Sequence, residues 1–201
     1  MNCLKNLKTR QGRIYIFSAP SGAGKTTLCA AVRRHFPDMS YSISSTTRSP
    51  RKGEEEGVDY FFITVDEFKK GIKTNRWAEW AEVHGNYYGT CAAVIDAHIA
   101  SGGDLLLDID VQGTRQILKK YPRCITIFIM PPTLETLRKR LEFRGTETRD
   151  LIEKRIANAK AEMDLKYLYR HRIINDELSK AVDEVIAIIE GYRNRRSDGV
   201  A

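Results

Sequence analysis

Residues 14–27 read IYIFSAPSGAGKTT, an apolar strand followed by a glycine-rich loop and a lysine that opens a helical pattern. Backbone N–H groups in such a loop can surround phosphate oxygens at the start of a helix. Gly22 and Gly24 carry no Cβ, Lys25 can reach the β- and γ-phosphates, and the Thr26 hydroxyl can help to hold Mg²⁺. The stretch predicts a nucleoside triphosphate site formed by Ala19, Pro20, Ser21, Gly22, Ala23, Gly24, Lys25, Thr26 and Thr27.

Ala19 stands where the strict phosphate-loop pattern has glycine. Pro20 should hold residue 19 in the extended region, which alanine adopts easily, so the departure costs little. The alternative is a glycine-rich turn that binds nothing. The preceding strand and the helical pattern of Leu28, Ala31 and Val32 favour the phosphate loop.

Size and composition predict one cytoplasmic domain. The chain has 201 residues, and no apolar run is long enough for a membrane helix or a signal peptide. Its cysteines and histidines lack metal-ligand spacing, which predicts free thiols. The net charge of +7 suits either nucleic acid or small polyanions. Because many arginines occur at defined spacing, we expect small anionic substrates, with no nucleic acid and no membrane partner.

The hydrophobic pattern alternates strands with helices. Strands are expected at 13–18, 41–44, 60–64, 105–110, 124–130 and 173–174, and helices at 134–141, 152–167 and 178–189. A capping box at Thr64 and Glu67 predicts a further helix. The continuous apolar runs at 105–107 and 124–130 are typical of parallel strands covered on both faces. The pattern predicts a three-layer α/β fold, with residues 46–57 as an exposed loop.

Arg48 and Arg51 lie three residues apart among hydroxyl side chains. Two planar guanidinium groups suit one phosphate, although a basic surface loop would give the same pattern. Together with other motifs, this segment resembles the guanylate kinase family from about Gly12 to Gly191. The other motifs lie at 53–54, 59–60, 79–81, 85–89, 107–113 and 144–146.

The resemblance implies a P-loop NTPase-like parallel sheet covered by helices, with a GMP-binding subdomain and a lid. The domain would span 12–193 after an N-terminal extension at 1–11. Its core would comprise 12–43, 96–137 and 157–193, with the GMP-binding subdomain at 44–95 and the lid at 138–156. Phe143 departs from the small residue that the family often has in the lid.

The resemblance also implies site residues. Catalytic roles would fall to Lys25, Arg48, Arg140, Arg144 and Arg155, and Asn175 would join the loop in ATP binding. Arg48, Arg51, Tyr60 and Tyr88 would hold the GMP phosphate; Ser44, Glu79 and Thr90 would read the guanine; Asp108 would also contact GMP. Thr26, Asp108 and Asp110 would serve Mg²⁺.

Physical chemistry supports the guanine assignment, because one carboxylate can accept both the N1–H and N2–H donors of guanine, whereas adenine would leave it unpaired. The residues alone leave simpler interpretations open. Glu79 could be an exposed helix residue, Asp110 a helix cap and Asn175 a loop cap. Arg140 and Arg144 could lie on a solvent-facing helix.

The implied reaction is ATP plus GMP giving ADP plus GDP, in purine nucleotide metabolism. The attacking phosphate oxygen is already ionised, so positioning and charge neutralisation replace a general base. One rival is a binding module of the same fold, which typically loses the loop lysine or the lid arginines. A kinase for sugar phosphates is another, and Ser44 and Glu79 argue against it. The pattern leaves monomer and homo-oligomer open.

Overall fold

The computed structural model describes residues 12–83, 85–143 and 148–195. By its contacts the chain forms two compact units. One comprises Met1–Tyr15, Asp38–Leu107 and Gln116–Cys124, and the other Ile16–Pro37, Asp108–Arg115 and Ile125–Ala201. The expected extension at 1–11, and the lid residues 144–147 with Arg144, lie outside the described residues.

The larger sheet has the strand order β2-β7-β1-β8-β9. These strands are β1 (Ile14–Ser18), β2 (Ser40–Tyr41), β7 (Leu105–Asp108), β8 (Ile125–Met130) and β9 (His171–Ile174). β2 pairs with β7, and β8 with β9, in parallel. Every residue of β1 is buried, as are Leu105–Leu107 and Ile125–Ile129, so the expected strands with two covered faces are confirmed. The strand expected at 41–44 is shorter, and the one expected at 105–110 ends at Asp108.

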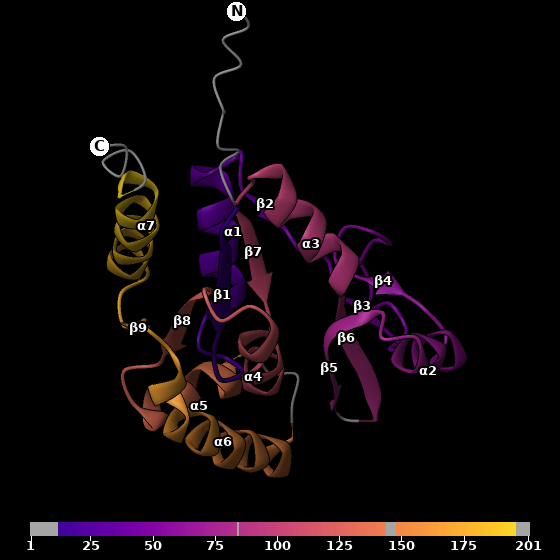
Figure 1. The fold of residues 1–201 in the computed structure, drawn as a ribbon. Helices are drawn as coiled ribbons and strands as arrows, with labels where there is room; N and C mark the ends of the chain where they lie inside the picture. The colour runs from indigo at the N-terminus through magenta and orange to yellow at the C-terminus, as the bar shows by residue number, and fades with distance from the viewer. Residues whose placement is uncertain (1–11, 84, 144–147, 196–201) are drawn as a thin grey trace, which may run out of the picture. The chain divides into compact units, whose positions relative to one another are not determined.

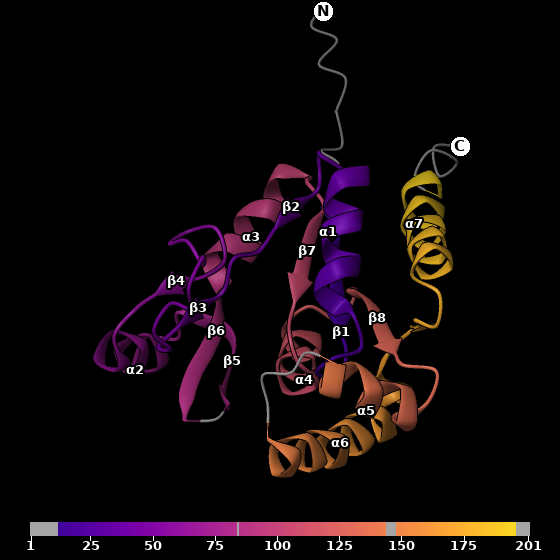
Figure 2. The same cartoon turned by 180° about the vertical axis from the view of Figure 1, so that it is seen from behind.

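Helices of the second unit follow the apolar periodicity. They are α1 (Lys25–His35), α5 (Leu134–Phe143), α6 (Arg149–Asp164) and α7 (Leu178–Asn194). α5 and α6 lie side by side (Figures 1 and 2), joined by a core of Leu137, Leu141, Ile152 and Ala159. The helix expected to reach residue 167 ends at Asp164, because the chain tightens into a 3₁₀ turn, η1 (Lys166–Leu168), with Tyr167 exposed.

The smaller sheet belongs to the first unit and has the order β4-β3-β6-β5. Its strands are β3 (Ser45–Thr46), β4 (Phe61–Phe62), β5 (Trp77–Val83) and β6 (Asn86–Cys91); the unit also contains α2 (Val65–Lys73) and α3 (Ala92–Ser101). β5 and β6 form an antiparallel pair beside α2, visible in Figure 1. The sequence patterns did not predict β3, β5 or β6. The capping box of α2 is confirmed, with Thr64 and Glu67 bonded reciprocally.

Side chains of β5 and β6 alternate between two faces of this sheet. Glu79 is paired with Thr90, whereas Trp80 is paired with Gly89 and therefore belongs to the other face. Phe68 of α2 stacks on Trp77, with ring centroids 4.5 Å apart, and on Tyr87 at 5.3 Å. This aromatic packing forms the core of the sheet.

The expected exposed loop at 46–57 begins later than predicted. Thr46 is fully buried in β3, and its hydroxyl donates to the carbonyl oxygen of Tyr87 at 3.0 Å. The paired strand therefore removes Thr46 from solvent, a tertiary effect that composition does not register. Residues 49–53 are exposed as expected.

Candidate active site

The glycine-rich loop adopts a backbone that only glycine tolerates at two positions. Gly22 and Gly24 both have φ of +93°, and Gly24 caps α1. A Cβ on Gly24 would lie 2.3 Å from the Asn175 Nδ2 atom, and one on Gly22 would lie 2.9 Å from a methyl carbon of Leu141. At these two positions the loop backbone therefore packs directly against Asn175 and against Leu141 of α5, with no room for a side chain.

Lys25 begins α1 beside the end of β7. Its Nζ atom lies 2.5 Å from the Asp108 Oδ1 atom and donates to the carbonyl oxygen of Ile109 at 3.4 Å. Burial lowers the pKa of Lys25, but the Asp108 carboxylate outweighs this effect and the pKa lies above the usual 10.5. Cys29 donates to the other oxygen of Asp108 at 3.6 Å. A permanently charged lysine is thus fixed next to the phosphate loop.

The two acidic residues after β7 have different surroundings. Asp110 Oδ1 accepts from the backbone N–H of Gly113 at 2.7 Å, at the start of α4 (Val111–Lys120). Asp110 is therefore a helix cap, the simpler interpretation that the sequence left open, and this contact leaves its second oxygen available. Thr26 is exposed. Carboxylate and hydroxyl oxygens suit Mg²⁺, so these side chains fit the cation, although the described residues hold no cluster of three metal-ligating His, Cys, Asp or Glu.

Two arginines expected in the lid contact the loop and its neighbour. The Arg155 Nη1 atom donates to the Ser21 hydroxyl at 2.7 Å, and Arg140 Nη2 donates to the carbonyl oxygen of Asn175 at 2.8 Å. Asn175 is buried, and its Nδ2 atom donates to the carbonyl oxygen of Ala23 at 2.8 Å. Arg155 of α6 therefore contacts the phosphate loop, and Arg140 of α5 contacts Asn175, which itself bonds the loop. The solvent-facing alternative is wrong for Arg140, which is partly buried.

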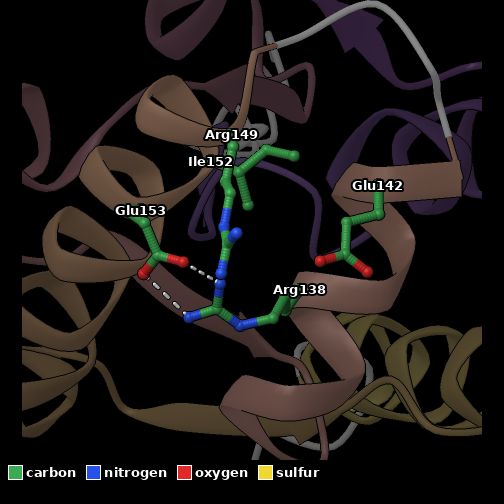
Figure 3. Close-up of a pocket in the computed structure, with 5 residues that line it drawn as sticks. All are labelled: Arg138, Glu142, Arg149, Ile152 and Glu153. Carbon is green, nitrogen blue, oxygen red and sulfur yellow. Dashed lines mark hydrogen bonds and ion pairs between the residues drawn. The ribbon is translucent and has the colours of Figure 1, made fainter.

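A pocket formed by residues of α5 and α6, shown in Figure 3, is lined by Arg138, Glu142, Arg149, Ile152 and Glu153. Both Nη atoms of Arg138 in α5 donate to the carboxylate of Glu153 in α6. The hydrogen bond from Arg138 lowers the pKa of Glu153. This fork links the two helices, and sequence reasoning did not predict it because the two residues are not helical neighbours.

Glu79 lies in a polar cluster of the first unit. Its side chain is buried, and Oε1 accepts from the Thr90 hydroxyl at 2.6 Å. The Thr90 and Ser44 hydroxyl oxygens are 3.4 Å apart. The alternative of an exposed helix residue is wrong, since Glu79 lies on β5 and only 5 % of its surface is exposed. The fold has brought together the three residues expected to read guanine.

Arg48 forms a second cluster in the same unit. Its guanidinium carbon lies 5.5 Å from the ring centroid of Tyr60, whose ring is 6.0 Å from that of Tyr88. Arg48 Nη2 donates to Glu54 Oε1 at 2.8 Å, and this bond, with a further one to Tyr88, raises the pKa of Arg48. Three of the four residues expected at the GMP phosphate are therefore adjacent, whereas the side chain of Arg51 is exposed.

Two acidic residues, Glu54 of the first unit and Glu162 of the second, were not predicted as site residues. Glu54 connects two positions of the loop: one of its oxygens accepts from Arg48, and the other accepts from the backbone N–H of Arg51 at 2.7 Å. Its position three residues after Arg51 was the available signal. Burial, with the nearby Asp110 carboxylate, raises the pKa of Glu162 in α6 to about 7, against the opposing effect of Lys25. No local sequence pattern predicts the role of Glu162, because Glu162 and Asp110 are far apart in the sequence and come close only in the folded chain.

The structure also bears on two expectations drawn from composition, the free thiols and the lack of a membrane helix. Cys29, Cys91 and Cys124 are free thiols, as expected. Within the part of the chain that the structure describes, no helix is both long and apolar enough to cross a membrane.

Comparisons with known proteins agree on one family. The sequence profile described as guanylate kinase matches residues 11–192. A guanylate kinase of Geobacter sulfurreducens is 47 % identical over 180 residues, covering 90 % of this chain and 89 % of that protein. One of Halalkalibacterium halodurans is 42 % identical over 190 residues, covering 94 % and 93 %. The crystal structure of guanylate kinase from Anaplasma phagocytophilum superposes with a TM-score of 0.73 at 30 % identity, covering 91 % of this chain and 87 % of that one.

Proposed function

This chain belongs to the guanylate kinase family, and we propose that it transfers the γ-phosphoryl group of ATP to GMP, giving ADP and GDP, through the residues named below. The observation that carries the choice of acceptor is the buried carboxylate of Glu79 beside two hydroxyl groups. A carboxylate can accept two adjacent N–H donors together, and guanine is the purine base that supplies them.

The donor side is built by the phosphate loop. The backbone of residues 19–27 binds the triphosphate, and Lys25 neutralises charge on its β- and γ-phosphates. Arg140, Arg144 and Arg155 place positive charge around the transferred phosphoryl group. Two of these arginines contact the loop or its support in the structure, which favours this assignment. Asn175 supports ATP binding through the loop carbonyl that it holds.

The acceptor side uses the two clusters of the first unit. Arg48, Arg51, Tyr60 and Tyr88 hold the phosphate of GMP, and Ser44, Glu79 and Thr90 read its base. The proximity of Arg48 to both tyrosines supports the phosphate site. Asp108, through its contact with Lys25, lies at the donor end and orients the lysine. The GMP phosphate attacks as an anion, so these residues orient it and need not remove a proton.

Thr26, Asp108 and Asp110 would hold Mg²⁺, which supplies charge neutralisation at the bridging phosphates when it is bound. We propose a domain plan with the core at 12–43, 96–137 and 157–193, the GMP-binding subdomain at 44–95 and the lid at 138–156. We place the reaction in purine nucleotide metabolism in the cytoplasm, with ATP and GMP as the partners.

The test is ADP release with Mg²⁺ and ATP, with GMP, AMP, CMP, UMP or no acceptor. We expect a large rate only with GMP, and its loss in Lys25→Ala. Lys139→Ala, which removes an exposed lysine paired with Glu135, should keep full activity and serves as the matched control. If no acceptor stimulates turnover in folded protein that binds ATP, the chain is a binding module and the proposal fails.

A further inference from the structure

A shift of register in β5 decides which face of the smaller sheet carries Glu79. Trp77 is paired with Cys91 and Glu79 with Thr90, so two steps along β5 match one step along β6. Ala78 is therefore an extra residue, as in a β-bulge. With regular pairing, Trp77 and Glu79 would be two positions apart and would share one face of the sheet. The register shift puts them on opposite faces instead.

The side-chain contacts on the two faces agree with this register. Trp77 stacks on Phe68 of α2, with ring centroids 4.5 Å apart. On the other face, Glu79 accepts from the Thr90 hydroxyl at 2.6 Å. Regular pairing would turn the Glu79 carboxylate towards the aromatic rings and away from Thr90. The extra residue therefore aims this carboxylate at its polar cluster.

The last part of α4 bonds the backbone of β5 on both sides of the shift. β5 is an edge strand of the described sheet, so the outward-facing groups of its backbone have no strand to pair with. After the shift, Gln116 Oε1 accepts from the Trp80 N–H at 3.1 Å, and Gln116 Nε2 donates to the Trp80 carbonyl oxygen at 2.7 Å. Before the shift, Lys120 Nζ donates to the carbonyl oxygen of Trp77 at 3.0 Å. All four residues belong to the first unit.

The Gln116 amide does what a neighbouring strand would do. It carries one acceptor and one donor, and it satisfies both backbone groups of Trp80. Backbone groups of successive strand residues point to opposite edges, so those of Glu79 and Ala81 face β6. Holding Trp80 therefore fixes the backbone directly next to Glu79.

We propose that Gln116 is a positioning residue for base selection: its amide holds Trp80 and thereby keeps the register shift that aims Glu79 at the base of GMP. The proposal rests on the function proposed above, which assigns Glu79 to guanine. Loss of the amide leaves both backbone groups of the half-buried Trp80 without this partner, so the strand next to Glu79 is free to move. The carboxylate then loses its fixed direction.

The test is Gln116→Met, which keeps the side-chain length and the helix propensity and removes the amide. We expect the KM for GMP to rise about tenfold, the size of about one net hydrogen bond, with kcat and the KM for ATP unchanged within about twofold. The ratio of kcat/KM for GMP to that for AMP should fall by a similar factor. Lys119→Met changes an exposed residue of the same helix and is the matched control, which should keep the KM for GMP. An unchanged KM for GMP in folded Gln116→Met would overturn the proposal.

A double-mutant cycle tests whether Gln116 acts through Glu79. In a Glu79→Gln background there is no carboxylate to aim, so Gln116→Met should lower kcat/KM for GMP less than it does in the wild type. Additive effects would contradict the proposal. Should Gln116→Met not fold, Gln116→Glu replaces it, because this variant keeps the size but sets an oxygen against the Trp80 carbonyl. It must raise the KM for GMP in the same way, and a wild-type KM there would refute the role of the amide.

Amide hydrogen exchange tests the positioning role even if the wild type lacks GMP-dependent turnover. In Gln116→Met, the N–H groups of Glu79 and Ala81 should exchange faster than in the wild type, while those of β8 keep their rates. Faster exchange in β8 as well would show a general loss of stability and contradict the proposal. Unchanged exchange at Glu79 and Ala81 would contradict it too.

Discussion

Replacing Glu79 by glutamine changes one oxygen of a buried side chain and should alter the choice of base. In the wild type the Thr90 hydroxyl donates to Glu79 Oε1 at 2.6 Å. A carboxylate has two oxygens and several lone pairs, so it can also accept from the N–H donors of guanine. Glutamine has only one oxygen. If that oxygen keeps the Thr90 proton, the amide NH₂ group faces the base and opposes the donors of guanine.

The magnitude follows from the contacts that are lost. Two charge-assisted hydrogen bonds become one neutral bond or a clash, which costs about 3–4 kcal/mol, or about 10²–10³-fold in kcat/KM for GMP. Adenine presents an acceptor at N1 and a donor at its amino group, so the amide suits it better than the carboxylate did. We therefore expect kcat/KM for AMP to rise while that for GMP falls.

The assay compares ADP release with GMP and with AMP over a range of concentrations. Glu82→Gln is the matched control, because Glu82 is exposed and lies three residues along the same strand, on the opposite face. It should leave the ratio of the two kcat/KM values unchanged. A Glu79→Gln enzyme with the wild-type ratio would refute the assignment of Glu79 to the base, even if its overall rate were lower.

Three further predictions concern the second unit. Arg140→Ala should lower kcat about 10²–10³-fold in steady-state assays while the KM for GMP changes less than about threefold, and an unaltered kcat would remove Arg140 from the mechanism. Arg138→Glu should lower the melting temperature at low salt, Glu153→Arg in the same chain should restore it, and a lack of restoration would show that the interhelical fork of Figure 3 contributes nothing. The raised pKa of Glu162, about 7, means that its neutral form stabilises the fold fully below about pH 4.5 and that this stability is lost as pH rises through 7. Glu162→Gln should therefore match the wild type in free energy of unfolding at pH 5 and exceed it at pH 8, by about 1 kcal/mol after discounting for partial exposure. Thermal denaturation at the two pH values measures this, and equal melting temperatures of the two proteins at both would contradict the shift.

Local patterns in the sequence were enough for the phosphate loop and the main sheet. Residues 14–27 predict strand, glycine turn and helix because each step depends on near neighbours, and the structure has them at β1 and α1. The capping box at Thr64 was equally local, and the apolar runs marked β7 and β8. The GMP residues were named only through the family resemblance, since a glutamate between tryptophans carries no signal of its own.

Which polar groups meet depends on how the whole chain folds. β5 does not show a clear alternation, so its strand character, and with it the burial of Glu79, depends on pairing with β6. Gln116 of α4 bonds the backbone of Trp80 across 36 residues of the chain. Periodicity reports whether a side chain faces inward, but the identity of its partner depends on the path of the whole chain. Local sequence was therefore enough to predict the kind of chemistry at the loop, whereas the contacts of its lysine and acidic residues follow from the fold.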